Sequence, residues 1–238
     1  MGTSLLLSES IIAIGGLKDS GKSTATEMLY YLLNAPKIFR KYEVYNVLKR
    51  WPFKKKWNIT AFAKPLKETL SIILNRPFNW FENRSNKEQY YVDLQSLNIY
   101  PKWKLHNDII LSESKFQKYI KSGEPLPLDS VLSIRQLMQY YGTECVRKFL
   151  GDKTWINATL NKHLQKNLII SDLRFKIEYT EIKKRKGITI YIQRDSAIPG
   201  NHSSEREVLE LYNDNKFDYV VKNNGTLKDL FNNLKQLL

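Results

Sequence analysis

The segment Gly16–Ser23, with the sequence GLKDSGKS, limits the folds open to this chain more than any other feature. It fits the pattern GxxxxGK[ST]; an apolar run (SIIAIG, 10–15) precedes it, and residues 22–34 carry apolar side chains at helical spacing. Between a strand and a helix, the glycines of such a loop let backbone amides converge on phosphate oxygens, and the helix N-terminus favours negative charge. Lys22 would reach the β- and γ-phosphates, and the Ser23 hydroxyl can bind Mg²⁺. The sequence therefore predicts a nucleoside-triphosphate site at this segment, which we call the phosphate loop.

Apolar runs and helical patterns alternate along most of the chain. This alternation predicts an α/β fold in which a parallel sheet of about five strands has helices on both faces. Residues 76–131 are less regular, because several prolines interrupt the pattern. The expected strands are 10–15, 57–62, 167–171, 188–193 and 217–221, and the expected helices are 22–34, one beginning near Pro65, 113–122, 132–149, 152–165, 175–186 and 226–237.

Length and composition indicate a globular protein. A chain of 238 residues is about one and a half typical domains long, so we expect a single domain, 1–238, with an embedded subdomain. The chain has no run of 18 apolar residues, and its first residues lack the basic start of a signal peptide. Its one cysteine, Cys145, fits a reducing compartment, and we interpret it as a core residue. We therefore expect a cytoplasmic protein without a membrane segment.

The chain is strongly basic, with Lys+Arg 38 against Asp+Glu 24 and a formal net charge of +14. Much of the excess lies between Lys37 and Lys67, where Trp51, Phe53 and Trp57 are interleaved. Such a pattern can bind nucleic acid through phosphate contacts and base stacking. A subdomain whose aromatic side chains form a small core while its lysines face water would look the same. We favour this second interpretation and do not expect a nucleic-acid partner.

Asp172 and Arg174 follow the predicted strand 167–171. A carboxylate at the C-terminal end of a parallel strand lies where ligands bind in open α/β sheets. Asp172 could hold Mg²⁺ through water or orient an acceptor substrate. It could equally cap the helix expected at 175–186.

The predicted helix 132–149 has two distinct faces. At 100° per residue, Arg135, Gln139 and Gly142 fall on one stripe, and Thr143 lies beside it. Glycine inside a helix costs about 1 kcal/mol relative to alanine, so we expect another group close to the backbone at Gly142. The stripe suits the phosphate and base of a nucleotide, although a solvated face would have the same composition. The side chains expected to pack inward are Ile134, Leu137, Met138, Tyr141, Cys145 and Phe149.

In several segments the chain resembles the deoxynucleoside monophosphate kinases of tailed bacteriophages. The similarity covers most of 10–33, 60–75 and 132–238, whereas 34–58 and 95–130 align poorly, and we interpret those two as inserted or peripheral segments. The segments that carry it, besides the phosphate loop, are AFAKPLKETL, SIRQLMQYYGTECVRKFLGDKTW, SDLRFKIE, NHSSE and KNNGTLKDLFNNLKQLL.

This resemblance implies a P-loop NTPase fold of the nucleoside-monophosphate-kinase type, with inserted acceptor-binding and lid segments. It implies Mg²⁺-dependent transfer of the γ-phosphoryl group of ATP to a deoxynucleoside monophosphate (dNMP), giving a dNDP and ADP, as in EC 2.7.4.13. It also implies a homodimer and, for a viral protein, the host cytoplasm. Segment 194–204 is the lid candidate, with His202 as a loop or hinge residue.

The resemblance assigns site residues by position. The catalytic residues would be Lys22, Arg135, Asp172 and Arg174. Either Arg84 or Lys87 would reach the acceptor phosphate. Trp155 would belong to the acceptor site, but it could instead be an aromatic residue of the core. The ATP-binding residues would be Gly16, Lys18, Asp19, Ser20, Gly21, Lys22, Ser23 and Thr24, with Ser23 on Mg²⁺; the acceptor site would comprise Leu66, Lys67, Arg84, Lys87, Arg135, Gln139, Gly142, Thr143, Trp155, Asp172 and Arg174.

Two other functions remain open at the level of sequence. One is a different small-molecule P-loop kinase, such as a dephospho-coenzyme A kinase. The other is a nucleic-acid-dependent ATPase that uses the basic stretch 37–67, for which a steep loss of binding with salt would be expected.

Overall fold

The computed structural model describes residues 11–106, 108–163, 166–198 and 203–238. The chain forms two compact units. The first contains the chain up to Phe62 together with Thr159–Leu238, and the second is Ala63–Ala158. Of the two segments expected to be inserted or peripheral, 34–58 lies in the first unit and 95–130 in the second.

The first unit is built on a five-stranded parallel sheet with the order β2-β6-β1-β7-β8. Strands covered on both faces are near-continuous apolar runs, and Ile12, Ile14 and Ile190 are accordingly fully buried. The fold class predicted from the alternating pattern is confirmed. The strands are β1 (Ile11–Gly15), β2 (Trp57–Thr60), β6 (Asn167–Leu173), β7 (Ile188–Gln193) and β8 (Tyr219–Lys222).

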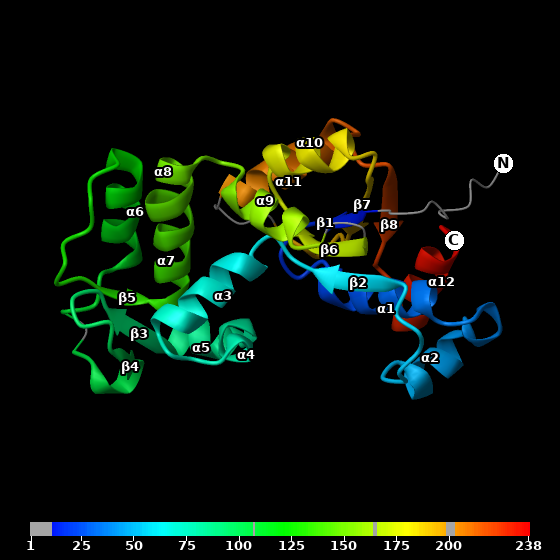
Figure 1. The fold of residues 1–238 in the computed structure, drawn as a ribbon, viewed down its shortest axis with the longest axis horizontal. Helices are drawn as coiled ribbons and strands as arrows, with labels where there is room; N and C mark the ends of the chain where they lie inside the picture. The colour runs from blue at the N-terminus through cyan, green and yellow to red at the C-terminus, as the bar shows by residue number, and fades with distance from the viewer. Residues whose placement is uncertain (1–10, 107, 164–165, 199–202) are drawn as a thin grey trace. The chain divides into compact units, whose positions relative to one another are not determined.

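Helices cover both faces of this sheet (Figure 1). One face packs against α1 (Lys22–Asn34) and α12 (Leu227–Lys235), whose buried side chains share a core with Ile12 and Ile14. The other face carries α10 (Lys176–Lys184) and α11 (Ser203–Asn213). Helix α11 was not predicted from the sequence. The remaining elements of this part are the short helices Lys37–Phe39 and α2 (Tyr42–Leu48), and α9 (Thr154–Asn161) crosses the boundary between the units in sequence.

Aromatic side chains of the basic stretch pack in the first unit. The ring of Phe53 lies 5.7 Å from that of Tyr31, and Tyr45 lies 5.4 Å from Phe231. Trp57 is buried, whereas the lysines from Lys54 to Lys56 are exposed. The interpretation as an aromatic core with solvated lysines is confirmed for these residues, although Trp51 is 61% exposed.

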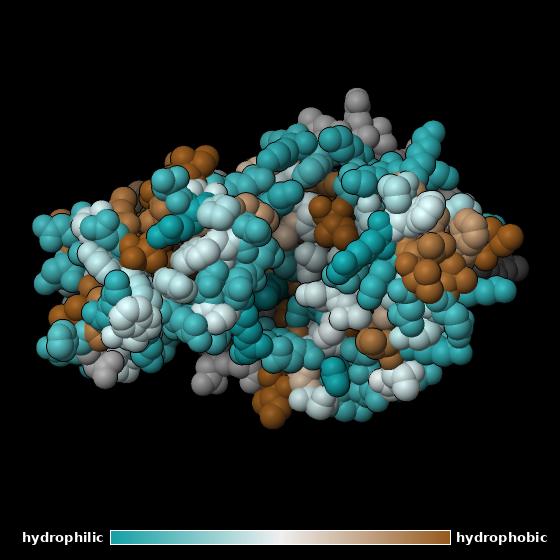
Figure 2. Space-filling view, turned by 90° about the horizontal axis from the view of Figure 1, so that it is seen from below, coloured by the Kyte–Doolittle hydropathy of each residue, from teal (hydrophilic) through white to brown (hydrophobic). Residues whose placement is uncertain are grey.

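Figure 2 shows hydrophobic residues in several separate places on the face in view.

The second unit has a three-stranded antiparallel sheet of order β4-β3-β5, which the sequence did not predict. Its core joins buried side chains of the sheet and helices, among them Leu70, Phe81, Val92, Phe116 and Leu132. The elements are α3 (Lys64–Ile73), α4 (Phe78–Glu82), α5 (Arg84–Gln89), β3 (Tyr90–Asp93), β4 (Ile99–Pro101), the short helix Lys102–Lys104, α6 (Glu113–Ser122), β5 (Val131–Ser133), α7 (Ile134–Gln139), a π-helical segment Tyr140–Arg147, and α8 (Lys148–Leu150).

The π-helical segment corrects two predictions about helix 132–149. The helix begins at Ile134 after strand β5, and Ser133 caps it by accepting a hydrogen bond from the Gln136 amide. A π-helix turns through a smaller angle per residue than an α-helix, so the predicted faces no longer hold after Tyr140. Cys145 is exposed and Phe149 is 79% exposed, so their prediction as core residues is wrong. Val146 is buried instead.

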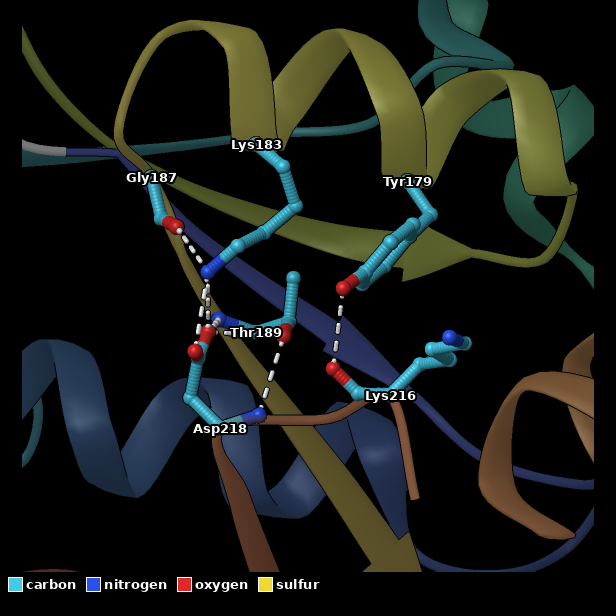
Figure 3. A network of polar contacts seen from close by, with 6 residues as sticks. All are labelled: Tyr179, Lys183, Gly187, Thr189, Lys216 and Asp218. Atoms are coloured by element: carbon cyan, nitrogen blue, oxygen red, sulfur yellow. Dashed lines mark hydrogen bonds and ion pairs between the residues drawn. The ribbon is translucent and has the colours of Figure 1, made fainter. Parts of the chain in front are cut away.

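A polar network fixes the edge strand β8 beside β7 at the N-terminal end of the sheet (Figure 3). The carboxylate of Asp218 accepts hydrogen bonds from the Thr189 amide and hydroxyl, both at 2.8 Å, and from Lys183 Nζ at 2.8 and 2.9 Å. Burial alone would raise the pKa of Asp218. The hydrogen bonds from Lys183 and Thr189 outweigh burial and hold that pKa below its usual 3.8.

We expect Asp218→Asn to destabilise the protein at pH 7 by about 1–2 kcal/mol, since it removes charge-assisted hydrogen bonds from a carboxylate that is about a third exposed. A carboxyl group with a lowered pKa in the folded state contributes stability above pH 3.8 and loses it as pH falls through the folded pKa. Urea unfolding from pH 7 to pH 3 should therefore show the two proteins converging below about pH 4. Asp214→Asn, at an exposed site, is the control. A difference that stayed constant with pH would contradict this account.

Candidate functional site

The phosphate loop connects β1, the central strand of the parallel sheet, to α1. Two of its residues must be glycine. Gly16 has φ 147°, and a Cβ there would lie 2.7 Å from the carbonyl oxygen of Ile192. Gly21 has φ 94°, and a Cβ there would collide with the Asn223 side chain. Glycine is therefore required at these two positions because the backbone is left-handed there and because β7 and the segment after β8 lie close by.

Lys22 folds back over this loop. Its Nζ donates hydrogen bonds to the carbonyl oxygens of Gly16, at 2.8 Å, and Leu17. Burial, followed by the charge of Arg174, lowers the pKa of Lys22 from 10.5 to about 8. The carboxylates of Glu205, Asp19 and Asp172 act in the opposite direction. The ammonium group thus lies among charges of both signs at the C-terminal edge of the sheet.

Ser20 supplies a polar group that lacks a partner. It is 1% exposed, and its Oγ has no hydrogen-bond partner among the described residues. Its carbonyl accepts a hydrogen bond of 2.8 Å from Asn223 Nδ2, which fastens the loop to the segment after β8. Ser20 also lines a cavity of about 240 Å³, together with residues that include Tyr191, Gln193 and Arg194. An unpartnered buried hydroxyl beside a glycine loop fits a phosphate-bearing ligand.

Asp172 and Arg174 lie at the same edge of the sheet. Strand β6 continues to Leu173, so Asp172 is within the strand, and its Oδ1 accepts a 2.7 Å hydrogen bond from the Phe62 amide. Glu178 Oε2 accepts hydrogen bonds from the amides of Arg174 and Phe175 at the start of α10. The alternative in which Asp172 caps this helix is therefore wrong. Asp172 instead ties the end of β6 to the segment after β2.

Three charged acceptor-site candidates of the second unit, Lys67, Arg84 and Arg135, form ion pairs with carboxylates. Arg135 Nη2 lies 3.1 Å from Glu88 Oε1, and Arg84 Nε lies 3.6 Å from the same oxygen. Lys67 Nζ lies 2.6 Å from Glu82 Oε1. Burial would raise the pKa of Glu88, but the hydrogen bond and charge of Arg135 lower it below its usual value, and Arg84 adds to this effect. Arg84 and Arg135 thus meet at one carboxylate.

Gly142, Leu66 and Trp155 form a compact group in the second unit. Trp155 Nε1 donates a 2.9 Å hydrogen bond to the Gly142 carbonyl, and a Cβ on Gly142 would lie 3.1 Å from Leu66 Cδ2. The close approach predicted at Gly142 is therefore made by side chains of the protein itself. Thr143 is exposed, and Gln139 and Lys87 are half-buried.

Two residues near the phosphate loop were missed by the sequence reasoning. Glu205 Oε2 accepts a 2.9 Å hydrogen bond from the Lys18 amide, and Asn223 holds Ser20 as described above. Both belong to segments that carry the resemblance, NHSSE and KNNGT, but neither spacing nor charge singled them out. Of the lid candidate 194–204, residues 199–202 with His202 lie outside the described residues.

A phosphate loop after the central strand of a five-stranded parallel sheet, with helices on both faces, defines a P-loop kinase fold. The sequence model of the deoxynucleotide monophosphate kinase family matches residues 67–234, more than two thirds of the chain. The chain therefore belongs to this family. A protein of Acanthamoeba polyphaga mimivirus, named "Putative deoxynucleotide monophosphate kinase", is 28% identical over 115 residues, which are 42% of this chain and 58% of that relative. The chain thus spans little more than half of the relative's length.

None of the helices in the described part of the chain has the length and hydrophobicity that a membrane crossing requires. Within the same residues, no three His, Cys, Asp or Glu side chains are grouped so that they could hold a metal ion.

We expect the Lys22 ammonium of the nucleotide-free protein to titrate near pH 8, because burial and Arg174 disfavour its charged form. The measurement is NMR of protein carrying ¹³C-labelled lysine side chains, with Lys22→Arg to assign the signal. The reference for comparison is the pKa of about 10.4 that a lysine side chain has in model peptides. A Lys22 midpoint in that same range would contradict the described surroundings of the side chain.

Proposed function

We propose that the protein is a deoxynucleoside monophosphate kinase that uses ATP as phosphoryl donor and a dNMP as acceptor, as in EC 2.7.4.13. The observation that carries this proposal is the phosphate loop with Lys22 in a P-loop kinase fold, in a chain that belongs to this family. We further propose that it acts as a homodimer in the cytoplasm.

The phosphate loop would bind the ATP phosphates. Residues 18–24 would hold the phosphate oxygens, with the backbone amides after Lys18 converging on them, and Lys22 would exchange the carbonyls of Gly16 and Leu17 for the β- and γ-phosphates. A phosphate is a stronger partner for an ammonium group than a neutral carbonyl, which favours this exchange. The adjoining cavity with Tyr191 and Arg194 is the place where the nucleoside of ATP would extend.

Residues of the second unit would bind the acceptor. Arg135 would exchange Glu88 for the 5′-phosphate, and Lys67 would release Glu82 in the same way. These ion pairs are exposed on at least one side, and such pairs stabilise a protein by only about 0–1 kcal/mol, so a dianionic phosphate can displace them. Either Lys87 or Arg84 would reach the phosphate; the nucleoside would contact Leu66, Gln139, Gly142, Thr143 and Trp155.

The proposed transfer requires no nucleophilic side chain. An oxygen of the acceptor 5′-phosphate forms a new bond to the γ-phosphorus of ATP, while the bond from that phosphorus to the β,γ-bridging oxygen breaks. ADP leaves with the electron pair of the broken bond, and the dNMP becomes a dNDP. Lys22, Arg135 and Arg174 would stabilise the negative charge on the transferring group, and Asp172 would orient the acceptor.

The phosphate loop offers Mg²⁺ one oxygen ligand, the Ser23 hydroxyl, and no cluster of carboxylates. Ser23 follows Lys22 directly and would be the protein ligand, with Asp172 acting through water. When bound with ATP, Mg²⁺ neutralises phosphate charge. We therefore expect activity to require Mg²⁺.

The direct test is ADP release with ATP, Mg²⁺ and one candidate acceptor at a time: dGMP, dTMP, dCMP, dAMP and the ribonucleotides. Turnover that depends on a deoxynucleoside monophosphate would support the proposal and give the base preference. Dephospho-coenzyme A, DNA and RNA are tested in parallel. Turnover only with dephospho-coenzyme A, or ATP hydrolysis stimulated only by nucleic acid, would overturn it.

Two variants separate the donor and acceptor roles. Lys22→Ala should reduce kcat by about 10²–10³-fold, because it removes a cation from the transferring phosphate, while circular dichroism should remain unchanged. Arg135→Ala should raise the KM for the dNMP and lower kcat, and it should leave the affinity for ATP unaltered. Arg76→Ala, at an exposed site in the same unit, is the matched control for an arginine loss. An active Lys22→Ala protein, or an Arg135→Ala protein with unaltered acceptor kinetics, would refute the corresponding role.

A further inference from the structure

Glu205 connects helix α11 to the phosphate loop, although it lies 187 positions away from Lys18 in the sequence. It stands in the first turn of α11 and is only 7% exposed. Its Oε2 accepts the 2.9 Å hydrogen bond from the Lys18 amide. A carboxylate buried to this extent requires compensation by donors or positive charge, and both are present here.

The positive charge comes from the phosphate-binding candidates. Lys22 and Arg174 lie close enough for the charge of Arg174 to lower the pKa of Lys22. Among the three carboxylates that act on Lys22, Glu205 has the largest effect, ahead of Asp19 and Asp172. Before a nucleotide arrives, Glu205 is therefore the carboxylate that most strongly compensates the charge of Lys22.

Other hydrogen bonds hold the phosphate loop on both sides of the Lys18 amide. Lys22 Nζ holds the carbonyls of Gly16 and Leu17, and the Ser20 amide donates to the Leu17 carbonyl at 3.2 Å. Asn223 fixes the far side of the loop at the Ser20 carbonyl. The Lys18 amide lies between these points, and Glu205 is the partner that fixes it.

We propose that Glu205 is a positioning residue that holds the phosphate loop ready for the phosphates of the donor nucleotide. It acts through the Lys18 amide and does not itself contact the reacting groups. A loop that is ordered before binding loses less conformational freedom when the ligand arrives, and affinity rises accordingly. Only the identity of the nucleotide in this inference rests on the proposed function.

The chain offers a matched control for this role. Glu207, two residues further along α11, also accepts a hydrogen bond from a backbone amide, but from Lys176 at the start of α10, at 2.9 Å. Loss of Glu207 removes the same kind of contact without touching the phosphate loop. Glu205→Gln keeps an oxygen that can accept from Lys18 and removes the negative charge.

The first measurement is amide hydrogen exchange without nucleotide, followed over the peptide that covers residues 16–22. Glu205→Ala should accelerate exchange there by about tenfold or more, because one lost hydrogen bond of about 1.4 kcal/mol corresponds to that factor. Glu205→Gln should show a smaller increase. Glu207→Ala should leave this peptide unchanged.

The second measurement is binding of ATP and of dNMP, followed by kinetics. Glu205→Ala should raise the Kd and the KM for ATP by about tenfold and leave the Kd for dNMP unchanged, with Glu205→Gln in between. Wild-type loop exchange and wild-type ATP affinity in Glu205→Ala would overturn the proposal. If that variant does not fold, the same wild-type values in Glu205→Gln would overturn it.

The outcome is distinguishable from failure of the proposed function. If the function is wrong, the wild-type protein shows no dNMP-dependent turnover, yet exchange of the loop amides still depends on Glu205. If the Glu205 proposal is wrong, the wild-type protein shows dNMP-dependent turnover, and Glu205→Ala does not change the hydrogen exchange of the loop amides. Equal weakening of ATP and dNMP binding would also count against it, because that result indicates a general loss of structure.

Discussion

The turn from β1 into α1 is the constraint on which the first unit depends. Its backbone amides can face a single point only if the chain takes left-handed conformations, which Gly16, Asp19 and Gly21 adopt. The parallel order of the sheet then brings the ends of its other strands to the same edge. At this edge lie Asp172, near the end of β6, Arg174, which follows β6, and Asn223, which follows β8. The loop therefore gathers groups from distant parts of the sequence.

A second general feature of the structure is that internal partners compensate the charges of the basic residues in the proposed site. Three cations that the proposed reaction would use have internal partners in the nucleotide-free chain: backbone carbonyls hold Lys22, Glu88 holds Arg135, and Glu82 holds Lys67. Pairs of this kind are individually weak when exposed, so they keep cations in position without competing strongly against a phosphate. This arrangement suits a protein whose ligands carry several negative charges. It also explains why carboxylates accompany a set of basic residues in a chain with a large net positive charge.

The sequence predicted the parallel sheet well, because its strands are apolar on both faces and its helices follow a clear period. Strand β7 and helices α1 and α6 were predicted with the bounds observed. The antiparallel sheet was missed because β3, β4 and β5 have three or four residues each, too few to establish a period. Cys145 was misplaced because the π-helical segment changes the angle per residue, which no composition signal revealed. Glu205 and Asn223 could not be found at all, since their roles depend on contacts across 187 and 203 positions.

The central claim is that the γ-phosphoryl group of ATP is transferred to a dNMP rather than to water. The most direct measurement follows [γ-³²P]ATP during turnover with Mg²⁺ and each dNMP, with separation of the products by chromatography. The account predicts that the label appears in the β-position of the dNDP, in amounts equal to the ADP formed. Label released as inorganic phosphate in the presence of every dNMP would contradict it.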